Sequence, residues 1–126
     1  MQLRIMSFNV RGAFVDDGEN VWPARRDLNV AVIREHGPDL IGFQELQDGN
    51  WEDYEAALPD FGRLRGPAYN NREPFCYPSL FWRAPGLERV AEGGFWLSTT
   101  PEEFSASWDT NCVRSAAWVR LRETAS

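Results

Sequence analysis

Two apolar segments in the first third of the chain each end in a polar residue. The first runs from Ile5 to Asn9 and the second from Leu40 to Glu45. Each has the length of a buried strand, and a helical pattern separates them. Because α/β sheets bind ligands at the carboxyl ends of their strands, this arrangement predicts that Asn9 and Glu45 lie at one edge of a sheet.

The segment between these strands has the pattern of a helix. Pro23 stands where a first helical turn tolerates proline, apolar residues recur at helical spacing over 28–33, and His36-Gly37-Pro38 is a typical helix end. We interpret His36, the only histidine of the chain, as part of this helix end rather than as a catalytic base. A second, shorter helix is predicted over 51–58, with Asn50 as its N-terminal cap.

From residue 61 onward, short segments are separated by glycine and proline, which is typical of antiparallel strands. The predicted strands cover 61–65, 77–82, 87–90, 95–97 and 112–122. The last has an apolar face and a face rich in Arg and Trp, with Arg114 at an interior strand position. Apolar side chains on both faces of 2–9 predict a central strand between two layers. The whole pattern predicts an α/β fold, a mixed β-sheet with helices on one face, in one domain.

The composition limits the classes of partner. A net charge of −6 argues against a general basic surface for nucleic acid, which needs many cationic contacts, although it is compatible with a local basic pocket. No apolar run approaches the ~20 residues of a membrane span, and no signal-peptide pattern precedes the first strand, so we expect a cytoplasmic protein without a membrane span. Cys76 and Cys112 lack metal-binding spacing and are predicted to be reduced thiols.

Three side chains are candidates for chemistry. A carboxylate directly after a buried run, as at Glu45, is costly unless it is exposed, paired or bound to a cation, and Mg²⁺ prefers one or two carboxylates with phosphate oxygens and waters. The Asn9 amide can orient a water, a carboxylate or a phosphate oxygen. The Arg114 guanidinium can hold a phosphate bidentately. Structural alternatives are a helix cap or ion pair for Glu45, a turn for Asn9 and an exposed cross-strand partner for Arg114.

The motifs Ser7-Phe8-Asn9 and Gln44-Glu45, together with Phe95-Trp96-Leu97-Ser98, resemble those of the endonuclease/exonuclease/phosphatase superfamily of metal-dependent phosphoesterases. The resemblance implies that Glu45 binds the essential divalent cation, Mg²⁺ or Mn²⁺, that Asn9 is the active-site Asn and that Arg114 contacts phosphate. It also implies a four-layered α/β/β/α sandwich, in which the segment around Phe95 is scaffold and pocket wall.

The sequence departs from the family pattern in two respects. Cys76 stands where many relatives have an acidic residue that pairs with a catalytic His. The Gly-Asp-x-Asn motif, a Ser-Asp-His-like motif and an earlier catalytic His do not occur in the chain. We therefore expect residues 1–126 to be the N-terminal part of a family domain whose C-terminal part is absent, and this half to supply one sheet and its helices.

The resulting expectation is a Mg²⁺-dependent phosphoesterase that hydrolyses phosphodiesters or phosphomonoesters and is weakly active or inactive as this chain. The alternative is a non-catalytic remnant or binding module that retains the scaffold. The expected partner is a phosphate ester, which belongs to a nucleic acid, a sugar phosphate, an inositol phosphate or a lipid head group. Because a half domain leaves apolar surface open, self-association or binding of a separate C-terminal half is also expected.

Overall fold

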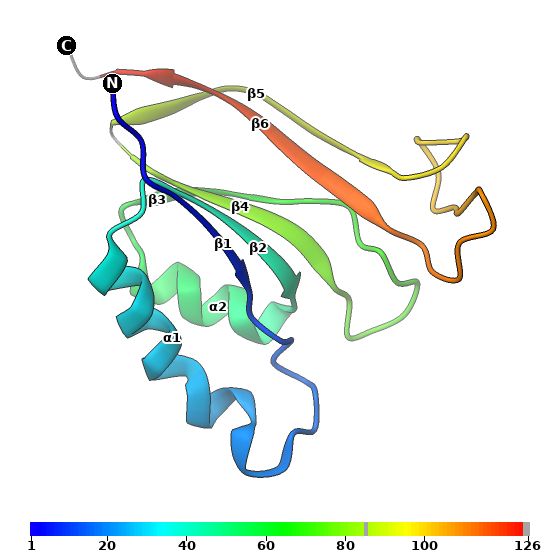
Figure 1. Ribbon diagram of the computed structural model, residues 1–126, viewed down its shortest axis with the longest axis horizontal. Coiled ribbons are helices and arrows are strands. Elements are labelled where there is room, and N and C mark those ends of the chain that lie inside the picture. Colours follow the sequence, from blue (N-terminus) through cyan, green and yellow to red (C-terminus); the bar gives the residue numbers. More distant parts are fainter. Residues whose placement is uncertain (85, 125–126) are drawn as a thin grey trace.

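The computed structural model describes residues 1–84 and 86–124. Figure 1 shows these residues in three layers: two helices, a four-stranded sheet, and a two-stranded sheet on the side away from the helices. In chain order the elements are β1 (Ile5–Asn9), the short 3₁₀ helix η1 (Gly18–Asn20), α1 (Trp22–His36), β2 (Leu40–Leu46), α2 (Asp48–Ala57), β3 (Phe61–Arg65), β4 (Tyr77–Arg83), β5 (Leu87–Trp96) and β6 (Ser115–Glu123). No helix among these residues is long and apolar enough to cross a membrane.

The four-stranded sheet is mixed, as the sequence predicts. Its strand order is β1-β2-β4-β3, with β1 parallel to β2 and the other neighbours antiparallel. The parallel pair follows from the strand-helix-strand connection through α1. Since β1 and β2 run side by side in the same direction, with Asn9 opposite Gln44, their carboxyl ends reach the same edge of the sheet.

The position of β1 differs from the prediction of a central strand. Within the described residues β1 pairs only with β2, and it therefore lies at an edge of the sheet. Its two faces also differ: Met6 and Phe8 pack against the core, whereas the side chain of Ile5 is 67 % exposed. The apolar character of both faces is thus correctly read from the sequence, but only one face is covered.

The second sheet corrects three expectations. The described residues form two sheets rather than one, because β5 and β6 pair as an antiparallel hairpin beside β4. The segments 87–90 and 95–97 belong to one continuous strand, Leu87–Trp96. The last strand begins at Ser115, so Arg114 precedes the strand instead of lying inside it.

Both helix ends of α1 follow the sequence signals. Pro23 lies in the first turn, and Gly37 adopts a left-handed conformation (φ 55°) in which its N–H donates to the carbonyl of Ile33 at 2.9 Å. His36 is the last helical residue, as expected.

The second helix starts earlier than predicted, at Asp48 instead of residue 51. Gln47 is its N-cap, and Asn50 is the third helical residue, whose Oδ1 accepts the Gln47 N–H at 3.0 Å. This reciprocal capping box satisfies two backbone donors and replaces the predicted cap by Asn50 alone.

The core lies between the four-stranded sheet and the helices. The ring of Phe43 stacks on Tyr54 at 4.6 Å between centroids and meets Phe81 edge-on at 5.2 Å. The buried Tyr54 hydroxyl accepts a hydrogen bond from Asn29 Nδ2 at 3.2 Å. These contacts join β2, β4, α1 and α2 into one packed unit, which fixes the sheet edge where β1 and β2 end.

Candidate active site

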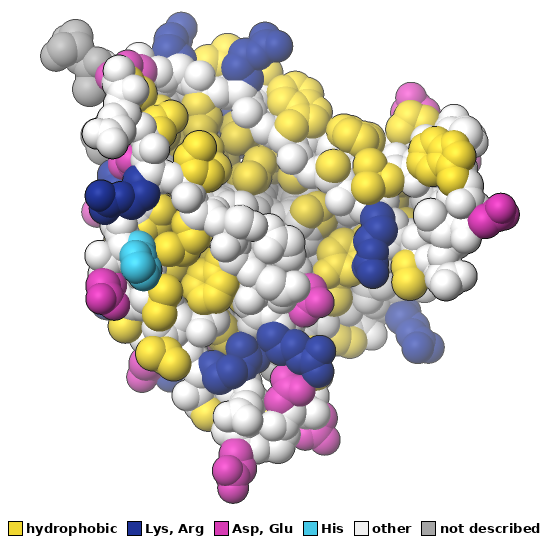
Figure 2. Space-filling model, viewed as in Figure 1, with side chains coloured by type: hydrophobic (Ala, Val, Ile, Leu, Met, Phe, Trp, Pro, Cys, Tyr) yellow, Lys and Arg dark blue, Asp and Glu magenta, His cyan; other side chains and the backbone are white. Residues whose placement is uncertain are grey.

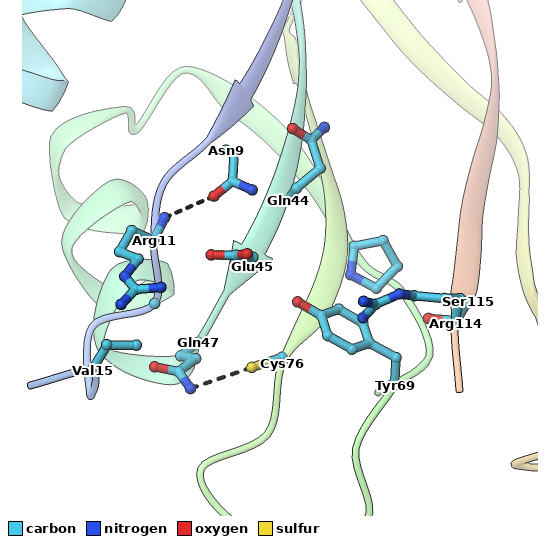
Figure 3. Close-up of a pocket in the computed structure, with 12 residues that line it drawn as sticks. Asn9, Arg11, Val15, Gln44, Glu45, Gln47, Tyr69, Cys76, Arg114 and Ser115 are labelled. Carbon is cyan, nitrogen blue, oxygen red and sulfur yellow. Dashed lines mark hydrogen bonds between the residues drawn. The ribbon is translucent and has the colours of Figure 1, made fainter. Parts of the chain in front are cut away.

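A pocket of about 510 Å³ opens at the carboxyl ends of β1 and β2 (Figure 3). It is lined by Asn9, Arg11, Gly12, Val15, Gln44, Glu45, Gln47, Tyr69, Cys76, Pro78, Arg114 and Ser115. All three residues that were singled out from the sequence, Asn9, Glu45 and Arg114, are in this set. They come from β1, from β2 and from the residue that precedes β6.

The backbone at Glu45 directs its side chain into the pocket. Glu45 has a positive φ of 60°, and the pairing of β2 with β4 shifts register between Phe43 and Leu46. Such a bulge reorients a side chain at the end of a strand, and a left-handed non-glycine residue is strained, which is a frequent feature of functional sites. Within the described residues Glu45 makes no ion pair and caps no helix. The structural alternatives for this carboxylate are therefore not realised.

Asn9 is held in one orientation. Its Oδ1 accepts the backbone N–H of Arg11 at 3.0 Å, which turns the amide nitrogen toward the pocket (Figure 3). The turn expected as the structural alternative is therefore present. It also leaves the amide N–H groups available to a ligand.

Arg11 is a pocket residue that the sequence reasoning missed. Its Nε and Nη2 donate to the two carboxylate oxygens of Asp17 at 3.1 and 2.9 Å. The hydrogen bond with Asp17 raises the pKa of Arg11, and the negative charge of Glu45 raises it further. In turn, the hydrogen bond from Arg11 lowers the pKa of Asp17. The signal available in the sequence was an Arg two positions beyond the strand end, next to a Gly- and Asp-rich loop.

Tyr69 is a second residue missed from the sequence. Figure 3 shows it on the side of the pocket away from Arg11, with its hydroxyl directed into the cavity. The guanidinium carbon of Arg114 lies 5.5 Å from the Tyr69 ring centroid, a cation–π distance that restrains the flexible Arg side chain. Burial raises the pKa of Tyr69, and Cys76 and Glu45 act in the same direction, so its hydroxyl is a neutral donor at ordinary pH.

Gln47 and Cys76 form the floor between the two sides. The Nε2 of Gln47 donates to the Cys76 sulfur at 3.3 Å, and its Oε1 accepts the N–H of Phe14 at 2.8 Å. Cys76 and Cys112 are not joined in a disulfide. They precede β4 and β6, respectively, and are not part of the strands.

The pocket therefore combines a carboxylate, three side-chain amides and two guanidiniums at one sheet edge, on a fold of two packed sheets and two helices. The sequence model of the endonuclease/exonuclease/phosphatase family matches residues 6–122. The chain belongs to this family.

Solved structures of family proteins share the fold. The endonuclease/exonuclease/phosphatase from Bacteroides vulgatus superposes with a TM-score of 0.87 at 29 % identity, over 96 % of this chain and 47 % of that one. The mannosyl-6-phosphatase of Bacteroides thetaiotaomicron gives 0.86 at 26 % identity, over 97 % and 46 %. An uncharacterized protein of Acanthamoeba polyphaga mimivirus is 28 % identical in an alignment of 117 positions, which covers 84 % of this chain and 42 % of the relative. The chain thus spans about half the length of these relatives.

The donor set of the pocket fits a hard cation that takes most of its ligands from water and phosphate oxygens rather than from protein side chains. Among the described residues, no group of three or more His, Cys, Asp or Glu side chains gathers that could hold a metal alone. Glu45 places one carboxylate in the pocket, beside the amides of Asn9 and Gln44. One carboxylate completed by waters and phosphate oxygens suits Mg²⁺ or Mn²⁺, whereas a site for Zn²⁺ would need several nitrogen or sulfur ligands.

Proposed function

We propose that this chain is the N-terminal part of an endonuclease/exonuclease/phosphatase domain and carries half of a metal-dependent phosphoesterase site. The reaction class is hydrolysis of a phosphate ester. The single observation that supports it best is the convergence of Asn9, Glu45 and Arg114 on one pocket at the carboxyl edge of the sheet. Three residues so far apart in sequence meet there because of the parallel β1-β2 pair and the return of β6 beside β4.

Glu45 would hold the cation, Mg²⁺ or Mn²⁺, because its strained backbone keeps the carboxylate in the pocket. When bound, the cation would polarise the phosphate and stabilise the developing charge. The Arg114 guanidinium binds a phosphate oxygen through charge-assisted hydrogen bonds, and its packing on Tyr69 limits the rotamers that it must give up. Asn9 donates from its fixed amide to the substrate or to the attacking water.

The substrate is a phosphate ester of a nucleic acid, a sugar, an inositol or a lipid head group. A sugar phosphate is favoured by the similarity to the mannosyl-6-phosphatase. A general base and further family ligands are not recognisable in this sequence, so we expect little or no turnover by this chain alone.

The second candidate function is a non-catalytic module that binds phosphate or metal without turning over an ester. The observation that favours it is the single carboxylate of the pocket, with the Cys76 thiol at the position where the family resemblance implies an acidic residue in many relatives. Binding of Mg²⁺ without phosphate release would support this candidate for the isolated chain.

The experiment that tests the metal role is a calorimetric titration of Mg²⁺ into the wild-type chain and two variants. Glu45→Gln removes the charge from the pocket and is expected to weaken Mg²⁺ binding by at least about tenfold. Asp48→Asn is the control, because Asp48 pairs with Arg65 at 3.1 Å and does not line the pocket. Unchanged Mg²⁺ affinity in Glu45→Gln would contradict the proposal. Phosphate release from mono- and diesters, with and without Mg²⁺, then separates the two candidate functions.

A further inference from the structure

The pocket has an arginine guanidinium on each side of the Glu45 carboxylate. Figure 3 shows Arg11 on one side of Glu45 and Arg114, against Tyr69, on the other. The family resemblance points only to Arg114 as a phosphate contact. Arg11 needs its own explanation, because it lines the same pocket.

The ion pair of Arg11 with Asp17 leaves part of the guanidinium available. The pair uses the edge formed by Nε and Nη2. A guanidinium carries five N–H donors, so the Nη1 side can still donate to an anion. The Arg11 side chain is also 56 % exposed, and exposed ion pairs are weak enough to yield to a competing ligand.

The backbone that carries Arg11 is fixed. Arg25 donates from Nη1 to the carbonyl of Val10 and from Nη2 to the carbonyl of Arg11, both at 2.9 Å, and Asn9 accepts the Arg11 N–H. Arg11 has a positive φ of 54°, so the loop turns sharply at the end of β1. A fixed loop that presents a guanidinium to a pocket lowers the entropy lost when a ligand binds.

We propose that Arg11 is a second phosphate-binding residue and that, together with Arg114, it selects phosphomonoesters over phosphodiesters. This inference rests on the proposed function. A phosphomonoester carries about two negative charges above its second pKa of ~6 and has three terminal oxygens, enough for two guanidiniums and a cation. A diester carries one charge and two terminal oxygens, so it can accept hydrogen bonds from one guanidinium fewer than a monoester can. The acidic net charge of −6 also disfavours a polymeric phosphodiester.

The test compares calorimetric binding of phenyl phosphate, a monoester, with that of methyl phenyl phosphate, a diester, in the presence of Mg²⁺. At about pH 7.5 the wild-type chain is expected to bind the monoester about tenfold more tightly, which corresponds to ~1.4 kcal/mol. Arg11→Gln is expected to remove most of this preference by weakening monoester binding alone. Arg114→Gln is expected to weaken binding of both esters.

The matched control is Asp17→Asn, which removes the partner of Arg11 and keeps the guanidinium. It is expected to leave monoester binding unchanged or stronger. If Arg11 served only to hold the loop through Asp17, Arg11→Gln and Asp17→Asn would lower the free energy of unfolding alike and neither would change the preference between esters. That result would overturn the inference.

A pH series supplies an independent readout. As the pH falls from about 7.5 to about 5, the monoester takes up a proton, so its affinity for the wild-type chain should fall while that of the diester stays flat. Arg11→Gln should show a shallower dependence. A wild-type chain that binds neither ester, or both equally, overturns the inference. The proposed function fails separately, if Mg²⁺ binding does not depend on Glu45.

Discussion

The backbone of Gly12 lies directly against the side chain of Gln47. A Cβ on residue 12 would overlap the Gln47 carboxamide, which is held on both ends by Phe14 and Cys76. Gln47 is only 5 % exposed, and moving its carboxamide away from residue 12 would break both of these hydrogen bonds. The loop after β1, the start of α2 and the pocket floor are thus joined at one contact.

Gly12→Ala should therefore destabilise the fold. Forcing a methyl group into this contact is expected to lower the free energy of unfolding by roughly 1–3 kcal/mol, as overpacking generally does. Gly42→Ala is the control, because the nearest atoms to a Cβ there are 3.9 and 4.0 Å away, which is ordinary contact. Urea unfolding followed by Trp fluorescence measures both variants. A Gly12→Ala chain as stable as wild type would show that Gln47 can move.

The backbone strain at Glu45 predicts that the Gly variant at this position is more stable than the Ala variant, the reverse of the usual order. A residue in the left-handed region costs roughly 1–2 kcal/mol unless it is glycine, so Glu45→Gly should unfold at higher urea concentration than Glu45→Ala. Gln44 has no positive φ and provides the control: there, the Ala variant should be more stable than the Gly variant. The same order at both positions would mean that the backbone at Glu45 relaxes once its side chain is removed.

The strand ends and the first helix could be predicted because their signals are local. An apolar run with a polar end, and a helix bounded by Pro23 and Gly37, depend on neighbouring residues only. The continuous β5 could not be predicted in this way. Gly93 looks like a strand end, yet it lies inside the strand because Trp118 of β6 packs where its Cβ would be. That reason lies in a distant segment.

The candidate site likewise contains some residues that local sequence signals predict and others that they do not. Asn9 and Glu45 were predictable because each stands at the carboxyl end of a strand whose direction the βαβ pattern fixes. Arg11 and Tyr69 lie in loops, where no periodic pattern shows which side chains turn toward the pocket. For Arg114, the family resemblance implies a phosphate contact, and its place outside β6 depends on where pairing with β5 starts.

Stability at alkaline pH should depend on Tyr54. Burial raises the pKa of its hydroxyl in the folded chain above the ordinary value of 10.0. Above pH 10.0 the unfolded chain therefore loses this proton while the folded chain keeps it, so the free energy of unfolding falls as the pH rises. The stabilising difference is fully present below that pH. Tyr54→Phe should be less stable at neutral pH, because Asn29 loses its buried acceptor, but its stability should fall less steeply between about pH 10 and 11. Equal slopes in urea unfolding series would contradict the assignment.

The face of β1 that points away from the core should mediate self-association of the chain. Ile5 is 67 % exposed there, on an edge strand whose other edge has no strand partner within the described residues. Figure 2 shows further apolar side chains on the exposed surface, and the hairpin contributes Val90 and Trp118, which are 50 % and 41 % exposed. Open edges with apolar neighbours favour pairing between chains.

Sedimentation velocity over a wide range of concentrations should accordingly show reversible association of the wild-type chain. Ile5→Lys is expected to shift it toward monomer, because a charge on an edge strand disfavours pairing. Leu28→Lys is the matched control: Leu28 is 68 % exposed but lies on α1, so the same substitution removes a similar apolar surface away from the sheet edge. Equal effects of the two variants would mean that general surface hydrophobicity, rather than the edge strand, causes association. A wild-type chain that stays monomeric at all concentrations would show that the open face of β1 does not bind a second copy.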